Sequence, residues 1–546
     1  MRIKRLLLLG GIFFVAAFFR FYNLSFVPPS PSLDEVSIGY NAYSILLTGK
    51  DEYGVSWPLL LRAYDDFRPA LYVYFTIPFV WLFGVTAISV RLPSVILSLI
   101  TVYVAYRTGK LIGKKYLSFD RLGDITAAIL AISPWHIYIS RLGHEANLGL
   151  TLVALGIYFL LQAVLTSYKN AWIFAAVAFG LSVHGYQSQK IISPLLLMLG
   201  GGLFWKELWH EKQKVLLAGV VGLIIALPAI TATLSPQGMV RFRGTSAFSQ
   251  DAGLVTAARE KYIAAKESGN RVLQIIHSRY ITNTIIFSTN YLSHFSPQWL
   301  FWGREKEAHK VPGLGLMYLW ELPFLLLGLW AIIASRLSRR IKALLLVGIF
   351  ISPIPASITT QAPHAMRAYT FIPFVQIVEA LGMWWVVRRL SKQQLRIFAV
   401  VIGMVVSMGL TKFWQGYFVR FPLEQSDSFQ YAMADAVTFA RSVQADYRTV
   451  EFSHQGALYQ SYMFFLFYTR FDPHEYLRLG GTISGGYEEA HIIDKYAFGM
   501  LPVKYEDMKK SVLYFYDSTM VPEGARVIRR FVNAGGKEAI VAAVKQ

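Results

Sequence analysis

The sequence contains about eleven apolar stretches long enough to cross a membrane as helices. A span needs about 20 mainly apolar residues, because a helix rises about 1.5 Å per residue through a hydrocarbon core about 30 Å thick. Only 16% of the 546 residues are charged, too few for the surface of an ordinary soluble protein. The sequence therefore predicts an all-α polytopic membrane protein with about eleven or more spans. The predicted spans lie near residues 6–22, 86–106, 124–141, 147–166, 171–187, 190–206, 214–234, 314–335, 341–358, 369–387 and 396–413.

The charge of the connecting segments predicts the orientation. The net charge is +20, and clusters of Lys and Arg separate apolar stretches at residues 107–121, 205–214 and 388–396. Cytoplasmic loops of membrane proteins carry this excess, so we place these loops and the N-terminus in the cytoplasm. The first apolar stretch lacks a small-residue cleavage site and is interpreted as a retained signal anchor. A nucleic-acid footprint would gather the charge on one domain instead.

One further apolar stretch, LYVYFTIPFVWLFG at residues 71–84, conflicts with this threading. If it crossed the membrane, every later basic loop would face the wrong side, so we predict a re-entrant or interfacial helix. A missed span elsewhere is the alternative. Three outer segments follow: the first outer loop at 23–85, the long outer loop at 235–313, and the segment 414–546. Residues 1–413 are then a transmembrane catalytic domain.

The C-terminal segment, residues 414–546, changes character. DSFQYAMADAVTFARSV has the pattern of an amphipathic helix, whereas TVEFSH, SVLYFYD and AIVAAVK have the pattern of strands between turns. We predict a small extracytoplasmic α/β domain.

Two carboxylates begin an amphipathic helix in the first outer loop. Asp34 and Glu35 precede an apolar stripe that includes Ile38 and Ala42. Ser32 lies three residues before Glu35, so a capping box accounts for Glu35 as well as a catalytic role does. Asp34 at a membrane boundary would be partly desolvated, as a general base requires.

Charged residues recur at two other outer positions. Arg68 precedes the stretch 71–84, where a guanidinium suits a phosphate group, although simple snorkelling is the alternative. Arg141, His144 and Glu145 lie at the outer mouth between two spans. Ionisable groups near membrane depth are costly, so three together predict a polar cavity. An ion pair between Arg141 and Glu145, one helical turn apart, is the alternative.

Further cations are predicted on the outer side, where the inside-positive pattern does not account for them. Arg241 and Arg243 lie in MVRFRGTSAF, and His364 and Arg367 lie in APHAMRAY. Such a cluster predicts an anionic ligand at this face.

No motif predicts a cofactor. The chain has no Cys, and His294 and His309 lack a recognised metal-ligand spacing. A divalent metal ion is left open.

The order of these motifs resembles the GT-C membrane glycosyltransferases related to protein O-mannosyltransferase and the lipid A aminoarabinose transferase. The resemblance implies an inverting glycosyltransferase that moves a sugar from a polyprenyl-phosphate donor to a glycan, lipid or protein acceptor. The reaction would take place on the extracytoplasmic face. The resemblance rests on PPSPSLDEVSIGYNAY, FRPALYVYFTIPFVWLFG, VRLPSVILSLI, SPWHIYISRLGHEANLG, YLSHFSPQWLF and APHAMRAYTFIPF.

The resemblance also implies roles for single residues. Asp34 is at the place of the catalytic carboxylate, and Glu35 completes the acidic pair. Arg68 is at the place of a basic residue before proline that meets the lipid phosphate, where relatives often carry Lys. Glu145 is at the place of a second acid that is frequently Asp. His364 and Arg367 would be further cavity residues.

A transporter or flippase of lipid-linked glycans is the alternative function. It would concentrate polar groups at mid-membrane on broken, paired helices, whereas the acids of this chain gather at one outer rim. A structural or sensor protein would not need about eleven spans.

Overall fold

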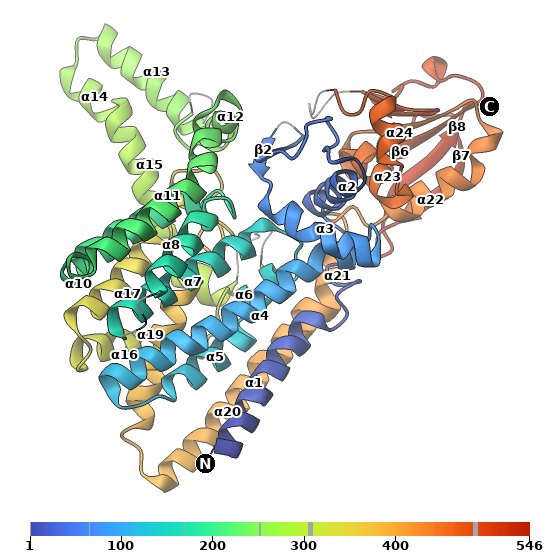
Figure 1. Cartoon of the computed structure of the whole chain (residues 1–546). Helices are drawn as coiled ribbons and strands as arrows, with labels where there is room; N and C mark the ends of the chain where they lie inside the picture. Colours follow the sequence, from blue (N-terminus) through green and yellow to red (C-terminus); the bar gives the residue numbers. More distant parts are fainter. Residues whose placement is uncertain are drawn as a thin grey trace. The chain divides into compact units, whose positions relative to one another are not determined.

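A computed structural model describes residues 2–64, 66–166, 168, 170–249, 253–303, 310–483 and 490–546. The chain forms two compact units, which are described separately (Figure 1). Unit 1 comprises Met1–Phe19, Leu97–Ile139 and Ala146–Phe413, and unit 2 comprises Arg20–Ile96, Ser140–Glu145 and Trp414–Gln546. Unit 2 thus combines the whole first outer loop with the C-terminal segment.

Every predicted span lies on a helix, with α5 and α6 together forming one of them. The helices that lie wholly or mostly in unit 1 are α1 (Arg2–Phe21), α4 (Ala87–Ile112), α5 (Leu122–Ile132), α6 (Pro134–Ser140), α7 (Glu145–Leu165), α8 (Ala171–Ser182), α9 (Gln189–Leu203), α10 (Trp205–His210), α11 (Lys212–Leu234), α12 (Pro236–Thr245), α13 (Gly253–Glu267), α14 (Arg271–Ile276), α15 (Arg279–Ser293), α16 (Glu321–Ala334), α17 (Arg339–Ile351), α18 (Ile354–Ser357), α19 (Phe371–Val387) and α20 (Lys392–Trp414).

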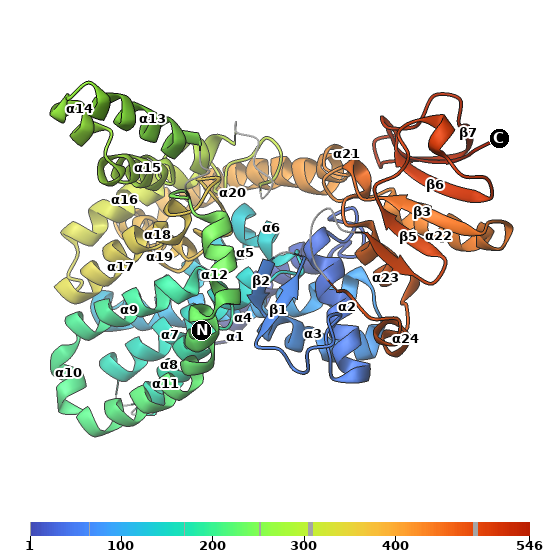
Figure 2. The ribbon, with the colours of Figure 1, turned by 90° about the horizontal axis from the view of Figure 1, so that it is seen from above.

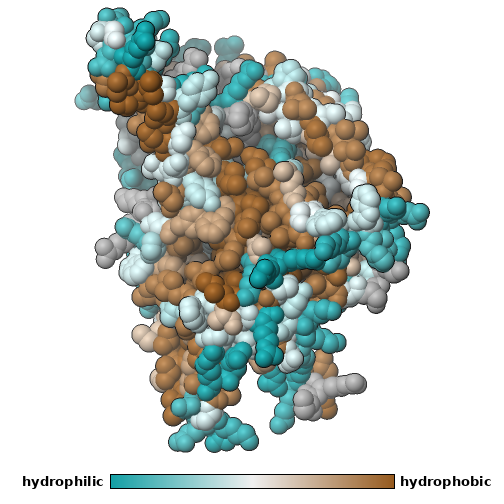
Figure 3. Space-filling view, turned by 90° about the vertical axis from the view of Figure 1, so that its left-hand side faces the viewer, coloured by the Kyte–Doolittle hydropathy of each residue, from teal (hydrophilic) through white to brown (hydrophobic). Residues whose placement is uncertain are grey.

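Helix length and composition identify an integral membrane protein. Within the described residues, five helical segments are long and apolar enough to cross a membrane, and α5 with α6, bent by 60°, can form a sixth span. Four other predicted spans correspond to the shorter apolar helices α8, α9, α16 and α19. A broad apolar band covers the face in Figure 3, with hydrophilic side chains gathered at its lower end. The exact number of crossings stays a prediction.

Glycines allow the closest helix packing in unit 1, between α16 and α19. A Cβ atom at Gly328 would lie 1.9 Å from the carbonyl oxygen of Val378, and one at Gly382 would lie 1.9 Å from that of Phe324. Any larger residue would push the two helices apart. Small residues at helix interfaces are typical of membrane bundles.

The long outer loop is largely helical. Helices α12 to α15 follow α11, and α13, α14 and α15 form a helical hairpin (Figure 1). Asn270 caps α14 and Ser278 caps α15 through their side-chain oxygens.

The N-terminal part of unit 2 contains the predicted amphipathic helix and the stretch before the second span. Helix α2 spans Leu33–Thr48, α3 spans Leu71–Phe83, and β1 (Leu60–Ala63) pairs with β2 (Asp66–Pro69) as an antiparallel hairpin. Figure 2 shows this hairpin beside α2 and α3. The predicted helix in 71–84 is confirmed, and its re-entrant or interfacial position stays a prediction.

The C-terminal part of unit 2 is the predicted α/β fold. Its six strands follow the order β4-β5-β3-β6-β8-β7, with β3 parallel to both β5 and β6 and the other pairs antiparallel. The predicted helix corresponds to α22 and the predicted strands to β3, β6 and β8. The elements are α21 (Phe421–Glu424), α22 (Met433–Val443), β3 (Thr449–Ser453), α23 (Ser461–Thr469), α24 (Pro473–Arg478), β4 (His491–Ile493), β5 (Tyr496–Gly499), β6 (Val512–Asp517), β7 (Arg526–Val532) and β8 (Glu538–Val544).

Helix α2 packs directly on α23 of the C-terminal part, because a glycine removes the side chain at the contact. A Cβ atom at Gly39 would lie 2.5 Å from the ring of Phe467. The Tyr40 hydroxyl donates a hydrogen bond to the carbonyl oxygen of Phe471, at 3.3 Å. Helix α2, which carries Asp34 in its first turn, is therefore held by a segment near the other end of the chain.

Candidate functional site

The first turn of α2 is held by a complete capping box. The Ser32 hydroxyl accepts from the backbone N–H of Glu35, and the Glu35 carboxylate accepts from that of Ser32 at 2.8 Å. The same carboxylate accepts from the N–H of Gly143 at 2.9 Å. The capping-box alternative predicted for Glu35 is confirmed, and the side chain is fully buried with several donors around it.

Arg91 on α4 neutralises Glu35. Its guanidinium donates to both carboxylate oxygens, at 2.7 and 3.2 Å, and is itself inaccessible to solvent. It also donates to the carbonyl oxygens of Leu24, Pro28 and Ser30. This arginine thereby ties the segment before α2 to its first turn. Arg91 is not among the residues predicted from the sequence, although an arginine in an apolar helix is a usable signal.

Asp34 lies one residue away from Glu35 in a very different environment. Its side chain is 52% exposed, and Oδ1 lies 3.2 Å from Nη1 of Arg68, whose side chain is only 5% exposed. The β1–β2 hairpin positions Arg68, which pairs in register with Leu61. Burial opposes the charge of Arg68, but Asp34 and Glu145 more than offset it, so the pKa of this guanidinium is raised.

His144 lies between two carboxylates. Its Nε2 atom is 4.0 Å from Oδ2 of Asp34, and its Nδ1 atom is 3.7 Å from Oε2 of Glu145. Within the described chain, this buried Glu145 oxygen accepts no hydrogen bond. Asp34, Arg68, His144 and Glu145 therefore form one cluster in unit 2, open on the side of Asp34. The polar cavity predicted at the outer mouth included two of these four residues, His144 and Glu145.

Arg141 has other partners than those predicted. Its guanidinium is buried and donates to the carbonyl oxygens of Arg20 at 2.9 Å and Val27 at 2.7 Å. It also lies over the rings of Tyr417 and Phe418. These contacts join Arg141 to the backbone at Arg20 and Val27. They leave its guanidinium far less able to bind a substrate phosphate than that of Arg68.

A second buried carboxylate, Glu52, supports α2 from its other end. Its oxygens accept from Asn41 Nδ2 at 3.0 Å, Thr482 Oγ1 at 2.8 Å and the Tyr462 hydroxyl at 3.3 Å. Full burial raises the pKa of Glu52 to about 7, because the loss of hydration penalises the charged form more than the hydrogen bonds stabilise it. Glu52 joins α2 to α23 and to the segment after α24. No sequence motif distinguishes it.

The remaining predicted cations belong to unit 1. Arg367 donates to Thr359 Oγ1 at 2.8 Å and to the carbonyl oxygen of Thr360 at 2.9 Å, and His364 is buried beside it. Arg243 is exposed near the end of α12. The side chain of Arg241 lies outside the described residues.

His294 has a structural role in unit 1. Its Nδ1 atom is 2.7 Å from the carbonyl oxygen of Asn290, and its Nε2 atom accepts from the N–H of His364. Burial lowers the pKa of His294 to about 4, so the ring stays neutral and uses both nitrogens in these bonds. His309 lies outside the described residues. Among the described residues, no group of three or more His, Asp or Glu side chains could hold a metal ion.

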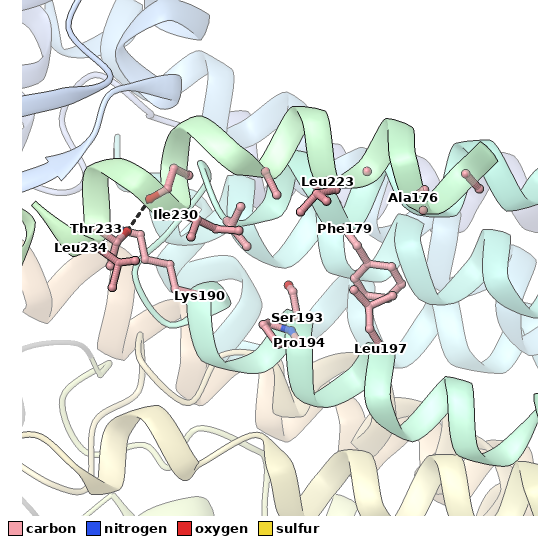
Figure 4. A pocket seen from close by; sticks show the side chains of 17 residues that line it. Ala176, Phe179, Lys190, Ser193, Pro194, Leu197, Leu223, Ile230, Thr233 and Leu234 are labelled. Carbon is pink, nitrogen blue, oxygen red and sulfur yellow. Dashed lines mark hydrogen bonds between the residues drawn. The ribbon is translucent and has the colours of Figure 1, made fainter. Parts of the chain in front are cut away.

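Two adjoining cavities lie in unit 1. The first, about 440 Å³, runs along α8, α9 and α11 and is mainly apolar, with Lys190 at one end beside Thr233 (Figure 4). The second, about 280 Å³, shares Lys190 and Thr233 with the first. Its lining is also mainly apolar but includes the polar side chains of Gln187, Thr359 and Arg367.

Comparisons with known proteins support the predicted family and fold. The family model of dolichyl-phosphate-mannose-protein mannosyltransferase matches residues 68–231. The crystal structure of ArnT from Cupriavidus metallidurans bound to undecaprenyl phosphate is 12% identical, with a TM-score of 0.53 over 99% of this chain and 98% of that chain.

A second similar fold is the Archaeoglobus fulgidus oligosaccharyltransferase tethered with an acceptor peptide. It is 13% identical, with a TM-score of 0.52 over 85% of this chain and 62% of that chain. No curated protein matches the chain by sequence. The predicted resemblance to the GT-C glycosyltransferases of the protein O-mannosyltransferase and aminoarabinose transferase type is confirmed, by the family model over residues 68–231 and by the fold over nearly the whole chain.

Proposed function

We propose that the protein is an inverting glycosyltransferase that transfers a sugar from a polyprenyl-phosphate donor to an acceptor on the extracytoplasmic face. The observation that carries this proposal is the cluster of an exposed carboxylate, Asp34, beside a buried guanidinium, Arg68, at 3.2 Å. A base and a phosphate-binding cation are the two groups that this reaction needs. The ArnT fold and its undecaprenyl phosphate ligand support the choice of donor.

Asp34 acts as the general base in this proposal. It takes the proton of the acceptor hydroxyl while the oxygen attacks the anomeric carbon from the side opposite the phosphate. The bond between that carbon and the phosphate oxygen breaks, and the electron pair leaves with the polyprenyl phosphate. The configuration at the anomeric carbon is therefore inverted.

Arg68 stabilises the departing phosphate. Negative charge grows on the leaving oxygen during bond breaking, so a fixed cation there lowers the energy of the transition state more than that of the ground state. The raised pKa of Arg68 keeps the guanidinium charged at all working pH values. Glu145 and His144 complete this cluster, with His144 between the carboxylates of Glu145 and Asp34.

Glu35 is proposed as a positioning residue rather than a proton acceptor. Its carboxylate is buried and bonded to Arg91, Ser32 and Gly143, so it fixes the start of α2 beneath Asp34. Arg141 is likewise proposed as a backbone clamp. In unit 1, Arg241, Arg243, His364 and Arg367 are proposed to favour an anionic ligand.

The topology proposal is unchanged from the sequence. The N-terminus is placed in the cytoplasm and residues 414–546 outside, with residues 1–413 as the membrane domain. The packing of α23 on α2 at Gly39 supports a common compartment for the C-terminal part and Asp34.

Transfer of a labelled sugar from a polyprenyl-phosphate donor to an acceptor tests the function. Purified wild-type and Asp34→Asn proteins are incubated with a panel of radiolabelled polyprenyl-phosphate sugars and cell-envelope acceptors. The wild type should transfer label, and Asp34→Asn should lose about 10²- to 10⁴-fold in turnover, the usual contribution of a general base. Asp435→Asn, an exposed carboxylate on α22, is the matched control and should keep full activity.

Two outcomes would contradict the proposal. Equal turnover by wild-type and Asp34→Asn proteins would remove the base. Movement of an intact lipid-linked sugar across a vesicle bilayer, without release from the lipid, would instead favour a flippase.

A further inference from the structure

The helical hairpin of the long outer loop contains a cavity that the proposed transfer reaction does not use. This hairpin cavity measures about 440 Å³, within the range of roughly 300–1,000 Å³ that small-molecule sites occupy. It lies between α13 and the start of α15, two helices that are joined through α14 (Figure 1). All of its lining residues belong to unit 1, so the cavity can be described from that unit alone.

Three basic side chains line the hairpin cavity. Arg259 comes from α13, His277 from the turn between α14 and α15, and Arg279 from the first turn of α15. Among the described residues, no Asp or Glu lines the cavity, because the two acids of α13, Glu260 and Glu267, lie outside it. An anion in the cavity would therefore meet cations without a competing carboxylate.

The start of α15 adds to the positive potential of the cavity. The Ser278 hydroxyl caps this helix by accepting from the backbone N–H of Ile281, at 3.5 Å. The N-terminus of a helix carries a partial positive charge, and α15 is 15 residues long. Residues 253–293 together hold five Lys and Arg against two Glu. Positive charge thus comes from side chains, from the helix end and from the hairpin as a whole.

Two tyrosines supply flat apolar surfaces beside these cations. Tyr262 on α13 is 37% exposed, and Tyr280 on α15 is 87% exposed. Thr282 and Asn283 add a hydroxyl and an amide group from α15. This combination suits a ligand that has both a ring face and hydrogen-bonding groups. A saccharide has both, because its hydroxyls form hydrogen bonds while its C–H groups pack on an aromatic ring.

We propose that the hairpin cavity binds an acidic saccharide, one that carries carboxylate or phosphate groups. Arg259 and Arg279 pair with the acidic groups through charge-assisted hydrogen bonds. Tyr262 and Tyr280 pack against the sugar rings, and Asn283 forms hydrogen bonds with the hydroxyls. The proposal goes beyond the transfer reaction and does not rest on it, since the cavity is in unit 1 and the proposed catalytic cluster is in unit 2.

The apolar tip of the hairpin favours a different partner, an anionic membrane surface. Val272, Leu273 and Ile275 on α14 are exposed, and binding to a bilayer would use these side chains. None of the three lines the cavity. A lipid surface also cannot enter a pocket between two helices, so the groups inside the cavity favour a small polar ligand.

Binding of saccharides to the purified full-length protein in detergent tests the proposal. The probes are trigalacturonate and glucose 6-phosphate, which separate a carboxylate ligand from a phosphate ligand. Maltotriose and glucose are the neutral controls, and inorganic phosphate is the control for an anion without a sugar. Calorimetric titration measures each Kd. At least one acidic probe should bind about tenfold or more tightly than its controls, with an affinity that falls as salt is added. Failure of both acidic probes to exceed their controls would overturn the proposal.

Arg259→Gln and Arg279→Gln test the cations. Glutamine has nearly the helix propensity of arginine, so the hairpin should keep its fold while it loses one charge. Each variant should weaken binding of the acidic probe by about three- to tenfold, as expected for a partly exposed charge-assisted contact. Arg271→Gln is the matched control, since it removes an exposed arginine of the same hairpin that does not line the cavity. Equal losses in all three variants, or wild-type affinity in all three, would contradict the proposed site.

Tyr280→Ala tests the aromatic surface. It should weaken binding of the acidic probe by about three- to tenfold and leave the affinity for inorganic phosphate unchanged. Ile275→Ala on α14 is the matched control and should bind the probe like the wild type, because this exposed side chain lies outside the cavity. A loss in Ile275→Ala with none in Tyr280→Ala would assign the hairpin to a lipid surface instead. Asp34→Asn should bind the probe normally, so this test and the transfer assay can fail independently.

Discussion

Two carboxylate–arginine pairs lie at the start of α2, and they differ in almost every physical respect. Glu35 and Arg91 are fully buried and bidentate, with further hydrogen bonds around them. Asp34 and Arg68 meet through one contact of 3.2 Å, and the carboxylate is half exposed. Adjacent residues on a helix point in directions about 100° apart, so one faces the protein and the other faces the opening.

The difference between the two pairs indicates how a carboxylate can be kept available to a substrate. A carboxylate surrounded by donors cannot accept a substrate proton without losing several interactions, whereas a half-exposed one can. The buried pair supplies rigidity instead. Removing one partner of a buried pair is expensive, because the other charge stays buried without compensation.

Arg91→Met should have the largest effect on stability. It leaves the Glu35 carboxylate buried without its cation and frees the carbonyl oxygens of Leu24, Pro28 and Ser30. A loss of about 3–5 kcal/mol in the free energy of unfolding is expected. Thermal unfolding in detergent measures it. A melting temperature equal to that of the wild type would show that the pair contributes no rigidity.

Arg68→Met should affect activity rather than stability. We expect a large loss of turnover at nearly unchanged KM. Removal of a cation that meets developing charge typically costs about 10² to 10³ in kcat. Turnover of the labelled donor measures the effect. If KM alone rises, Arg68 binds the ground state only and the proposed transition-state role is wrong.

Glu52→Gln should change the dependence of stability on pH. Burial raises the folded-state pKa of Glu52 from 4.5 to about 7, so folding favours the neutral acid. Its contribution is fully present below about pH 4.5, falls as the pH rises toward about 7, and stays constant above that. The total change is at most about 3.5 kcal/mol, from about 1.4 kcal/mol per pKa unit.

Melting temperatures between pH 4.5 and 8 check this prediction. Glutamine resembles the neutral acid and can still accept from Asn41, so Glu52→Gln should flatten the curve in this range. Glu475→Gln, at a position on α24 where the side chain is 41% exposed, should leave it as in the wild type. An unchanged slope in Glu52→Gln would assign the pH dependence to other groups.

Arg68→Lys should have the smallest effect of these substitutions, and that effect should be on kcat. The positive charge is retained, so a decrease in kcat of about tenfold or less is expected. A decrease as large as that of Arg68→Met would mean that the guanidinium geometry, and not the charge, is needed.

The sequence by itself determined the membrane class, the helices and the candidate catalytic carboxylate. In a bilayer, an apolar stretch of about 20 residues can satisfy its backbone hydrogen bonds only as a helix. The alternation of side chains that predicts strands within residues 449–544 is equally local. The capping box at Ser32 and Glu35 was likewise readable, because its two residues are three positions apart.

The tertiary structure decided which charges meet. Arg91 and Glu35 are 56 residues apart, and Glu52 and Thr482 are 430 residues apart, so no local pattern connects them. Arg141 was assigned to a ligand from its neighbours in sequence, yet its guanidinium binds carbonyl oxygens more than 100 residues away. Helix periodicity is local physics, whereas the pairing of buried charges depends on which distant segments the fold brings together.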